Sequence, residues 1–267
     1  MKLKRCLALT RAGVIENLQF RLSMLVMVIG NILYLIVIYY LWKAIYASAG
    51  TDVVNGMTFT DTMIYLVLAT SLFGMMDLYT VWMMGRDIQS GKIVLDLLKP
   101  MGYRSWMFWS FSGNLVTNSI FTFLPTFIVV AVVANGAIPL GLNLLWFAIS
   151  VIMSISISYS IDFFVGTICL YMESIWGINI MKDVTVLLLS GATIPIAFFP
   201  EPLQTIAYYL PFQSIYNTPL TLLLNKDPMW QDIVIPLGTQ LIWVIAMFVI
   251  TRVFWKISLK QITVNGG

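Results

Sequence analysis

Two aspartates stand inside long apolar stretches and are the side chains best placed to do chemistry. Asp77 is the only charged residue of 63–84, and Asp162 is the only charged residue of 144–171. An acidic side chain at this depth in lipid costs about 2.5–3.5 kcal/mol on insertion scales, so each carboxyl should face a polar cavity or a partner. Intramembrane carboxylates can relay protons, and two that share a proton can form an acid–base pair.

The surroundings of the two aspartates argue against catalysis. The sequences MMDLYT and SIDFFVG lack the Tyr-Asp and Gly-x-Gly-Asp patterns of intramembrane aspartyl proteases. The chain has no histidine and no Gly-x-x-x-x-Gly-Lys-Ser/Thr motif. We therefore expect no catalytic residue, no metal ligand and no bound cofactor in this chain. A proton-coupled secondary carrier that uses Asp77 and Asp162 stays open as an alternative.

Small and polar residues recur along two of the apolar stretches. One stripe contains Asn114, Asn118, Thr122 and Thr126, and the other contains Ser150, Ser154, Ser158, Asp162 and Gly166. Small residues at helical spacing let helices approach closely, and hydroxyl and amide groups hydrogen-bond between helices. Close packing is therefore the simpler interpretation of both stripes, and a polar substrate path is the alternative.

The elements that carry these residues are transmembrane helices. Of the 267 residues, 60% are hydrophobic and 10% are charged, whereas soluble domains are roughly 25% charged. This composition predicts an all-α membrane protein with a single transmembrane domain over residues 1–267. A spanning helix needs about 20 mainly apolar residues. Six stretches approach or meet this criterion: 22–41, 63–84, 108–133, 144–171, 184–199 and 233–255.

The distribution of basic residues supports six spans rather than seven. With six spans both termini are cytosolic, and 13 of the 15 basic residues lie inside. These are Lys2, Lys4, Arg5, Arg11, Arg21, Arg86, Lys92, Lys99, Arg104, Lys182, Arg252, Lys256 and Lys260. A seventh span would place the last three outside. We therefore interpret 200–228, which contains Pro211 and Pro219, as a re-entrant or interfacial helical hairpin on the outer side.

Two further segments are expected to be helical without spanning. Residues 1–21 alternate leucines with cations at helical spacing, which fits an amphipathic helix on the cytosolic surface of the lipid. Residues 86–100 form the longest charged stretch and are either a solvated connector or a helix that docks on a cytosolic partner. For docking we expect contacts from Arg86, Asp87, Ile88, Lys92, Val94, Leu95 and Leu98.

The second half of the chain resembles the type-2 permease family of ABC exporters. The resemblance rests on Ser190-Gly191, Pro195, Phe199-Pro200, Leu210-Pro211-Phe212 and Pro219, taken in this order. The six-span layout, the N-terminal helix and the charged segment after the second span agree with it. After the last outer run the family often has a glycine, where this chain has Leu224-Asn225-Lys226-Asp227.

The resemblance implies a permease subunit of an ATP-driven exporter in the bacterial plasma membrane. It implies a second permease, identical or homologous, paired through the spans 22–41 and 184–199, and two ABC ATPase subunits that bind ATP and Mg. Residues 86–100 would be the coupling helix, and Pro195, Pro200, Pro211 and Phe212 would belong to an outer gate. Drugs, peptides, lipids and glycans are substrates in this family.

A membrane scaffold without transport is a third class of function, beside the exporter and the proton-coupled carrier. No nucleic-acid partner is expected, because no dense basic face exists.

Overall fold

The structure is a computed structural model of the whole chain that describes residues 2–76, 79–134, 138–139, 141–172 and 175–261. Nearly all of its regular structure is helical. The helices are α1 (Lys2–Gln19), α2 (Arg21–Ala49), α3 (Phe59–Met76), α4 (Thr80–Gln89), α5 (Ile93–Leu97), α6 (Tyr103–Asn118), η1 (Ser119–Phe123), α7 (Leu124–Val133), α8 (Leu142–Ile168), α9 (Ile175–Leu189), η2 (Ile196–Phe198), α10 (Glu201–Tyr209), α11 (Gln213–Leu224), α12 (Trp230–Ser258) and η3 (Leu259–Gln261). The strands β1 (Val53–Val54) and β2 (Met57–Thr58) form a short antiparallel hairpin.

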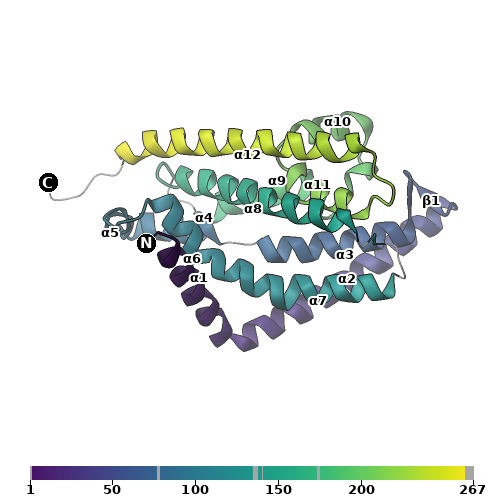
Figure 1. The fold of residues 1–267 in the computed structure, drawn as a ribbon, viewed down its shortest axis with the longest axis horizontal. Helices are drawn as coiled ribbons and strands as arrows, with labels where there is room; N and C mark the ends of the chain where they lie inside the picture. Colours follow the sequence, from purple (N-terminus) through teal and green to yellow (C-terminus); the bar gives the residue numbers. More distant parts are fainter. Residues whose placement is uncertain (1, 77–78, 135–137, 140, 173–174, 262–267) are drawn as a thin grey trace.

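The long helices run along one axis and leave the connecting segments at its two ends. The start of α1, the short helix α5 and the end of α12 lie at one end of the bundle, and the β1–β2 hairpin lies at the other (Figure 1). The arrangement places the described start and end of the chain on the same side as the charged segment between α4 and α6.

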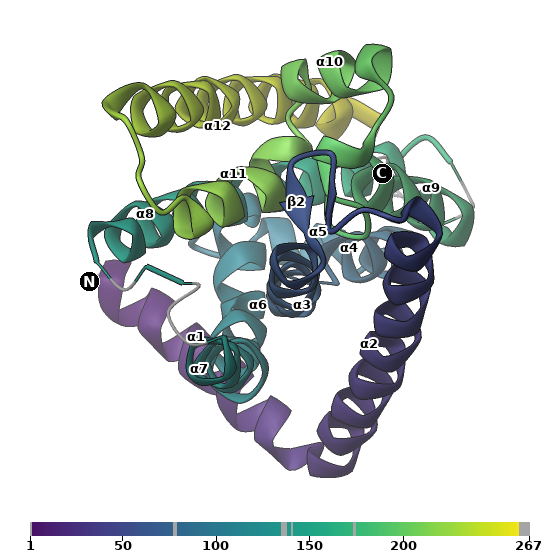
Figure 2. The ribbon, with the colours of Figure 1, turned by 90° about the vertical axis from the view of Figure 1, so that its right-hand side faces the viewer.

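Helix α3 occupies the centre of the bundle when the molecule is viewed from the end (Figure 2). Its residues Leu66, Leu68 and Leu72 are fully buried, whereas α2, α7 and α12 expose many large apolar side chains. Within the described residues, five helical stretches are long and apolar enough to cross a membrane. Such faces would be unfavourable in water and are favourable in lipid. The fold is therefore an all-α, multi-pass membrane protein.

Helix α1 packs along α6 through a pair of glycines. A Cβ atom on Gly113 would lie 2.5 Å from the backbone carbonyl carbon of Gly13, so the two backbones are in direct contact. Polar pairs flank the crossing: Thr10 Oγ1 lies 2.6 Å from Ser112 Oγ, and Asn17 Nδ2 donates to Asn114 Oδ1 at 2.5 Å. The N-terminal segment is thus anchored to the bundle, while its Leu3 and Leu7 remain exposed.

The expected fifth span, 184–199, is wrong in its boundaries. The helix α9 runs from Ile175 to Leu189, and the chain then turns before η2. Gly191 has a φ of 79°, a left-handed conformation that a side chain would strain. Hydrophobicity alone extended the expected span past this turn because residues 190–199 are also apolar.

The expected helix over 86–100 is also wrong as a single element. Helix α4 continues to Gln89, and α5 begins only at Ile93. Gly91, with a φ of 72°, reverses the chain between them. The expected span 108–133 begins earlier, at Tyr103, and contains the π-helical turn η1. The extra residue of this turn precedes Pro125, which cannot donate a hydrogen bond to the preceding turn.

The expected span 63–84 begins in α3 and ends in α4; Asp77 lies outside the described residues, and Tyr79, which precedes α4, has a φ of 50°. The other expected elements differ from the structure only in extent. Residues 22–41 lie in the longer α2, residues 144–171 correspond to α8, and residues 233–255 lie within α12. Residues 200–228 contain the two helices α10 and α11, with Pro211 in the turn between them. Residues 1–21 contain α1 and the start of α2.

The glycine contact between α1 and α6 is directly testable. We expect Gly113→Ala to lower stability by about 1–3 kcal/mol, because the added methyl group overlaps the α1 backbone. Gly238→Ala in α12 is the matched control, since nothing lies within 4 Å of its added Cβ atom. That control should be neutral or slightly stabilising. Thermal unfolding in detergent measures both, and equal midpoints for the two variants would show that the contact is absent.

Candidate functional site

Asp162 is paired with a lysine from the next helix. Lys182 Nζ on α9 lies 2.9 Å from Asp162 Oδ1 on α8 and 2.5 Å from Asp183 Oδ1. Asp162 is buried, and Asn179 Nδ2 donates to Asp183 Oδ2 at 2.8 Å. The group carries two negative charges and one positive charge. Asp77 lies outside the described residues, so the alternative of a carrier that uses Asp77 together with Asp162 stays a prediction.

A cavity of about 260 Å³ opens beside this ion pair. Ser158 and Asp162 line it from α8, Lys182 and Asp183 line it from α9, and Tyr216 lines it from α11. The cavity is the polar environment that an intramembrane carboxylate requires. Sequence reasoning placed Lys182 in an inner flank and missed the pair, because no pattern in the sequence relates two residues that lie 20 positions apart on separate helices.

A buried glutamine joins three helices at the level of Ser154. Gln240 Nε2 on α12 donates to the carbonyl oxygens of Ser150 and Ser214 and to Ser154 Oγ, each at 2.9 Å. Ser150 Oγ donates to Gln240 Oε1 at 2.8 Å, and Ser154 Oγ donates to the Ser214 carbonyl at 3.0 Å. All four residues are fully buried. The serine stripe of α8 is therefore a helix-packing surface here, which agrees with the simpler interpretation of its spacing.

The asparagines of α6 also bind neighbouring helices. Asn114 accepts the hydrogen bond from Asn17 of α1, and Asn118 Nδ2 donates to the Gly74 carbonyl of α3 at 3.0 Å. Asn118 also lines a cavity of about 250 Å³ between α2 and α3. A neighbouring cavity of about 350 Å³ shares Asn31, Thr70 and Phe73 with it. Residues of α2 and α3 line both cavities, and α2 diverges from the bundle in the view of Figure 2.

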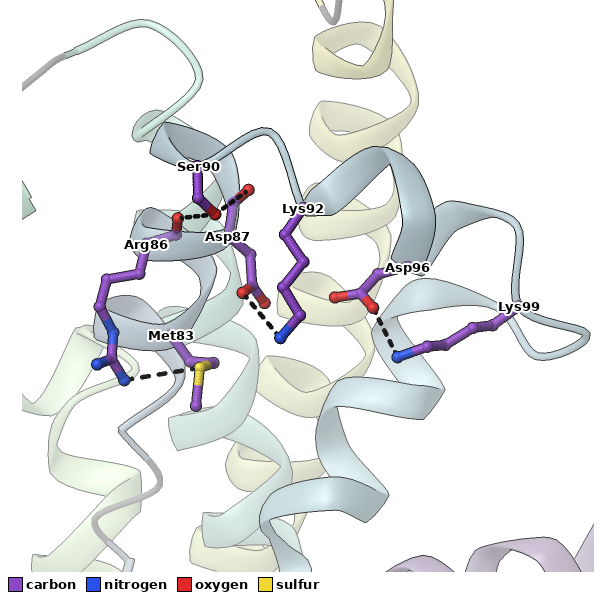
Figure 3. Close-up of polar contacts among 7 residues, drawn as sticks. All are labelled: Met83, Arg86, Asp87, Ser90, Lys92, Asp96 and Lys99. Carbon is purple, nitrogen blue, oxygen red and sulfur yellow. Dashed lines mark hydrogen bonds and ion pairs between the residues drawn. The ribbon is translucent and has the colours of Figure 1, made fainter.

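Two ion pairs stabilise the segment between α4 and α6, and the aspartate of each pair is buried. Lys92 Nζ lies 3.5 Å from Asp87 Oδ1, and Lys99 Nζ lies 2.6 Å from Asp96 Oδ1 (Figure 3). Asp87 is 3% exposed and Asp96 is 2% exposed. Among the described residues, Oδ2 of each aspartate is buried without a hydrogen-bond partner. The carboxyl groups of Asp87 and Asp96 also lie within hydrogen-bonding reach of each other, so a proton held between them would supply the missing donor.

The apolar residues of this segment divide into two groups. Ile88 and Val94, expected to face a partner, instead pack against the buried cluster around Met84, Met107 and Phe163. Leu95 is 65% exposed and Leu98 is 78% exposed. Helical spacing did not separate the two groups because the chain turns between α4 and α5. Arg86 is exposed and contacts only the Met83 sulfur among the described hydrogen bonds, at 3.7 Å.

The residues expected in an outer gate lie around the turn between α9 and α11. Pro195 and Pro211 are buried, Pro200 is exposed, and Phe212 is half-buried against the main core. Gly191 lies against Tyr65 of α3, whose hydroxyl donates to Asn217 Oδ1 of α11 at 3.3 Å. The hairpin of α10 and α11 is thus linked to the central helix.

Sequence reasoning also missed a connection made by Arg104 at the start of α6. Its guanidinium donates to Thr251 Oγ1 of α12 at 2.7 Å and to Ser160 Oγ of α8 at 2.8 Å. The group also lies 4.6 Å from the centre of the Phe248 ring, a favourable cation–π geometry. Arg104 was expected only as a topology-setting cation, whereas it joins three helices near the charged segment.

Helical architecture and apolar surface define a multi-pass membrane protein, and a family comparison identifies its class. The family model described as ABC-2 family transporter protein matches residues 32–266. The chain therefore belongs to the ABC-2 transporter family, as the resemblance of its second half indicated. No curated protein matches the chain significantly.

The ion pair of Asp162 generates a stability prediction. We expect Asp162→Asn to lower stability by about 1.5–3 kcal/mol, because it removes the buried charged hydrogen bond to Lys182 while the contact of Lys182 with Asp183 remains. Asp183→Asn removes the half-exposed partner of the same lysine and should cost less than about 1 kcal/mol. Thermal unfolding in detergent compares them. A larger loss for Asp183→Asn would show that the buried pair is not the stabilising one.

Proposed function

We propose that this chain is the transmembrane permease subunit of an ATP-driven ABC exporter. The observation that carries the proposal is the exposed pair Leu95 and Leu98 on and directly after α5, at the end of the bundle. The segment that holds them is anchored by the buried aspartates Asp87 and Asp96, which form ion pairs with lysines. An exposed apolar pair on a well-anchored turn is suited to insert into a groove on a partner. Membership of the ABC-2 family supports an ABC ATPase as that partner.

The proposed topology has six spans with both termini in the cytosol of a bacterial cell, and the protein lies in the plasma membrane. Helix α9 serves as the short fifth span, beside the five long apolar stretches. Supporting this, α5 and the end of α12 lie at the same end of the bundle (Figure 1). The basic residues Lys92, Lys99, Lys256 and Lys260 belong to these segments, as a cytosolic side requires.

The energy source in this proposal is supplied by other chains. No nucleotide-binding motif occurs in the sequence, so two ATPase subunits would bind ATP and Mg and carry out hydrolysis, and this chain would not be an enzyme. A second permease, identical or homologous, would complete the transporter. The exported substrate would be a drug, peptide, lipid or glycan. The two cavities beside α2 are suited to an amphiphilic molecule, because they combine Asn31 and Thr70 with apolar side chains.

The contacts provide a route from the docking segment to the outer hairpin. Helix α4 is tightly packed on its neighbours, because a Cβ atom on Gly85 would meet Ile175 and one on Gly166 would meet Met84. Helix α8 then reaches the hairpin through the hydrogen bond from Ser154 to Ser214 of α11. Movement of α5 driven by closure of the ATPase dimer would shift α4 and α8 and open the hairpin, a population shift driven by nucleotide affinity.

The proton-coupled carrier is the weaker alternative. Its relay would need an acidic side chain that exchanges protons, whereas Asp162 is held in an ion pair by Lys182. A carrier would work under a proton gradient without ATP and would lose transport in Asp162→Asn at temperatures where the variant remains folded. The exporter would keep its ATP dependence in that variant. Transport in vesicles with each energy source separates the two mechanisms.

The docking claim is tested by Leu98→Asp. We expect this variant to retain about tenfold less ATPase subunit than the wild type, because a charged group replaces an apolar contact worth about 1.5–3 kcal/mol when buried. Leu142→Asp is a control with similar exposure at the start of α8. Purification from host membranes in mild detergent, followed by assay of ATP hydrolysis in the eluate, measures retention. The proposal fails if the wild type retains no ATPase, or if both variants retain it equally well.

A further inference from the structure

A polar cavity of about 420 Å³ lies between the hairpin of α10 and α11 and the first half of α12. These segments lie toward the end of the bundle that carries the β1–β2 hairpin (Figure 1). The volume falls within the range of about 300–1,000 Å³ that is usual for small-molecule sites. Only Ile235 and Pro236 of the described lining residues are purely apolar, and neither lysine nor arginine is among them. The other lining residues carry amide, hydroxyl, phenol or carboxylate groups.

The α11 side of the cavity is a preformed set of buried amides and hydroxyls. Thr218 Oγ1 donates to Gln213 Oε1 at 2.9 Å, and Asn217 Oδ1 accepts the hydroxyl of Tyr65 at 3.3 Å. Asn217 is 7% exposed and lines the cavity. Among the described residues, its Nδ2 atom neither donates a hydrogen bond nor is sealed from the cavity. The bond to α3 therefore fixes the amide and leaves its N–H groups for a ligand.

The opposite side of the cavity adds donors and acceptors from the end of α11 and from α12. Asn225 Oδ1 accepts the backbone N–H of Asp227 at 3.3 Å, and Asp232 Oδ2 accepts that of Met229 at 3.1 Å. Asn225 Nδ2, Asp232 Oδ1 and the Thr239 hydroxyl line the cavity without a hydrogen-bond partner in the described part of the chain. The cavity thus presents amide donors, a hydroxyl and a carboxylate acceptor together.

This lining favours a neutral ligand that both donates and accepts hydrogen bonds. An anion would find no cation and would be repelled by Asp232. An ammonium would have Asp232 as its acceptor but would face the N–H groups of Asn217 and Asn225, which cannot accept. An apolar chain would leave all of these groups without hydrogen bonds, which is costly. A polyol satisfies them, because each hydroxyl both donates and accepts. Tyr208, which is 47% exposed, adds a ring surface for the carbon skeleton of such a ligand.

We propose that this cavity binds a sugar unit, either as a free saccharide or as the head group of a glycolipid. Asn217 and Asn225 donate to its oxygens, and one of its hydroxyls donates to Asp232 Oδ1. The sugar ring packs against Tyr208. Because these residues belong to α10, α11 and α12, the bound sugar joins the hairpin to the last helix. The inference goes beyond the proposed function and does not depend on ATP, on an ATPase partner or on the transported substrate.

The experiment uses the full chain in nanodiscs of phosphatidylcholine and phosphatidylglycerol. Saturation-transfer NMR measures the binding of the methyl glycosides of glucose, galactose and mannose. We expect one or more of them to bind, and the fully O-methylated analogue to bind at least about tenfold more weakly. That ratio corresponds to the loss of one hydrogen bond to a carboxylate. Equal binding of a glycoside and its O-methylated analogue would overturn the proposal.

A second arm distinguishes the two sources of the sugar. Glucosyl diacylglycerol is added to the nanodiscs, with diacylglycerol as its control, and native mass spectrometry counts the lipid retained by the protein. Preferential retention of the glucosyl lipid supports a glycolipid head group, whereas binding of the soluble glycosides alone supports a free saccharide. If neither the glycosides nor the glucosyl lipid binds, the cavity is not a sugar site.

Matched variants assign the binding to this cavity. Asn217→Asp keeps the oxygen that accepts from α3 and removes the amide donor, so affinity should fall about tenfold. Thr239→Val should lower affinity about fivefold, as expected for one neutral hydrogen bond. Thr205→Val on α10 is the control and should bind like the wild type, because its hydroxyl donates to its own helix and does not line the cavity. If Asn217→Asp fails to fold, Asp232→Asn at an exposed position should still lower affinity about tenfold. Unchanged affinity in every folded cavity variant would contradict the assignment.

Discussion

The bundle depends on satisfying polar groups that lipid cannot solvate. Gln240 does this for three helices at once, because its amide binds backbone and hydroxyl groups of α8 and α11 from its place on α12. In an apolar surrounding, each of these groups would otherwise cost free energy without compensation. The relative rotation of the three helices is thereby restricted to the register in which all of these hydrogen bonds form. The stripe of small residues on α8 permits the close approach that they require.

The same requirement explains why charges in this protein occur in compensated groups. Lys182 is placed between Asp162 and Asp183, and Arg104 is surrounded by hydroxyl groups and an aromatic ring. Asp87 and Asp96 follow the same rule, because each is paired with a lysine and their carboxyl groups lie within hydrogen-bonding reach of each other.

The segment between α4 and α6 combines exposed apolar side chains with buried charges. Leu95 and Leu98 are exposed, whereas Asp87 and Asp96 are buried. Lys92 and Lys99 compensate the two aspartates, so the charges that hold the segment in place are paired within it. The exposed leucines are therefore presented by a segment whose own charges are already satisfied by these pairs.

The sequence by itself determined that this protein is embedded in lipid, and it determined the positions of most helices. Apolar runs of about 20 residues report burial in lipid directly, because hydrophobicity depends only on local composition. Order and spacing of prolines and glycines after residue 189 were enough to indicate the family. Which polar side chains pair with each other, however, was decided only by the tertiary structure. Lys182 and Asp162 meet because α8 and α9 are adjacent, and Gln240 meets Ser154 because α12 returns along α8. Likewise, the turn at Gly91 decides that Val94 is half-buried against a core cluster while Leu98 is exposed. Such contacts depend on how helices rotate against one another, which the pattern along a single helix does not contain.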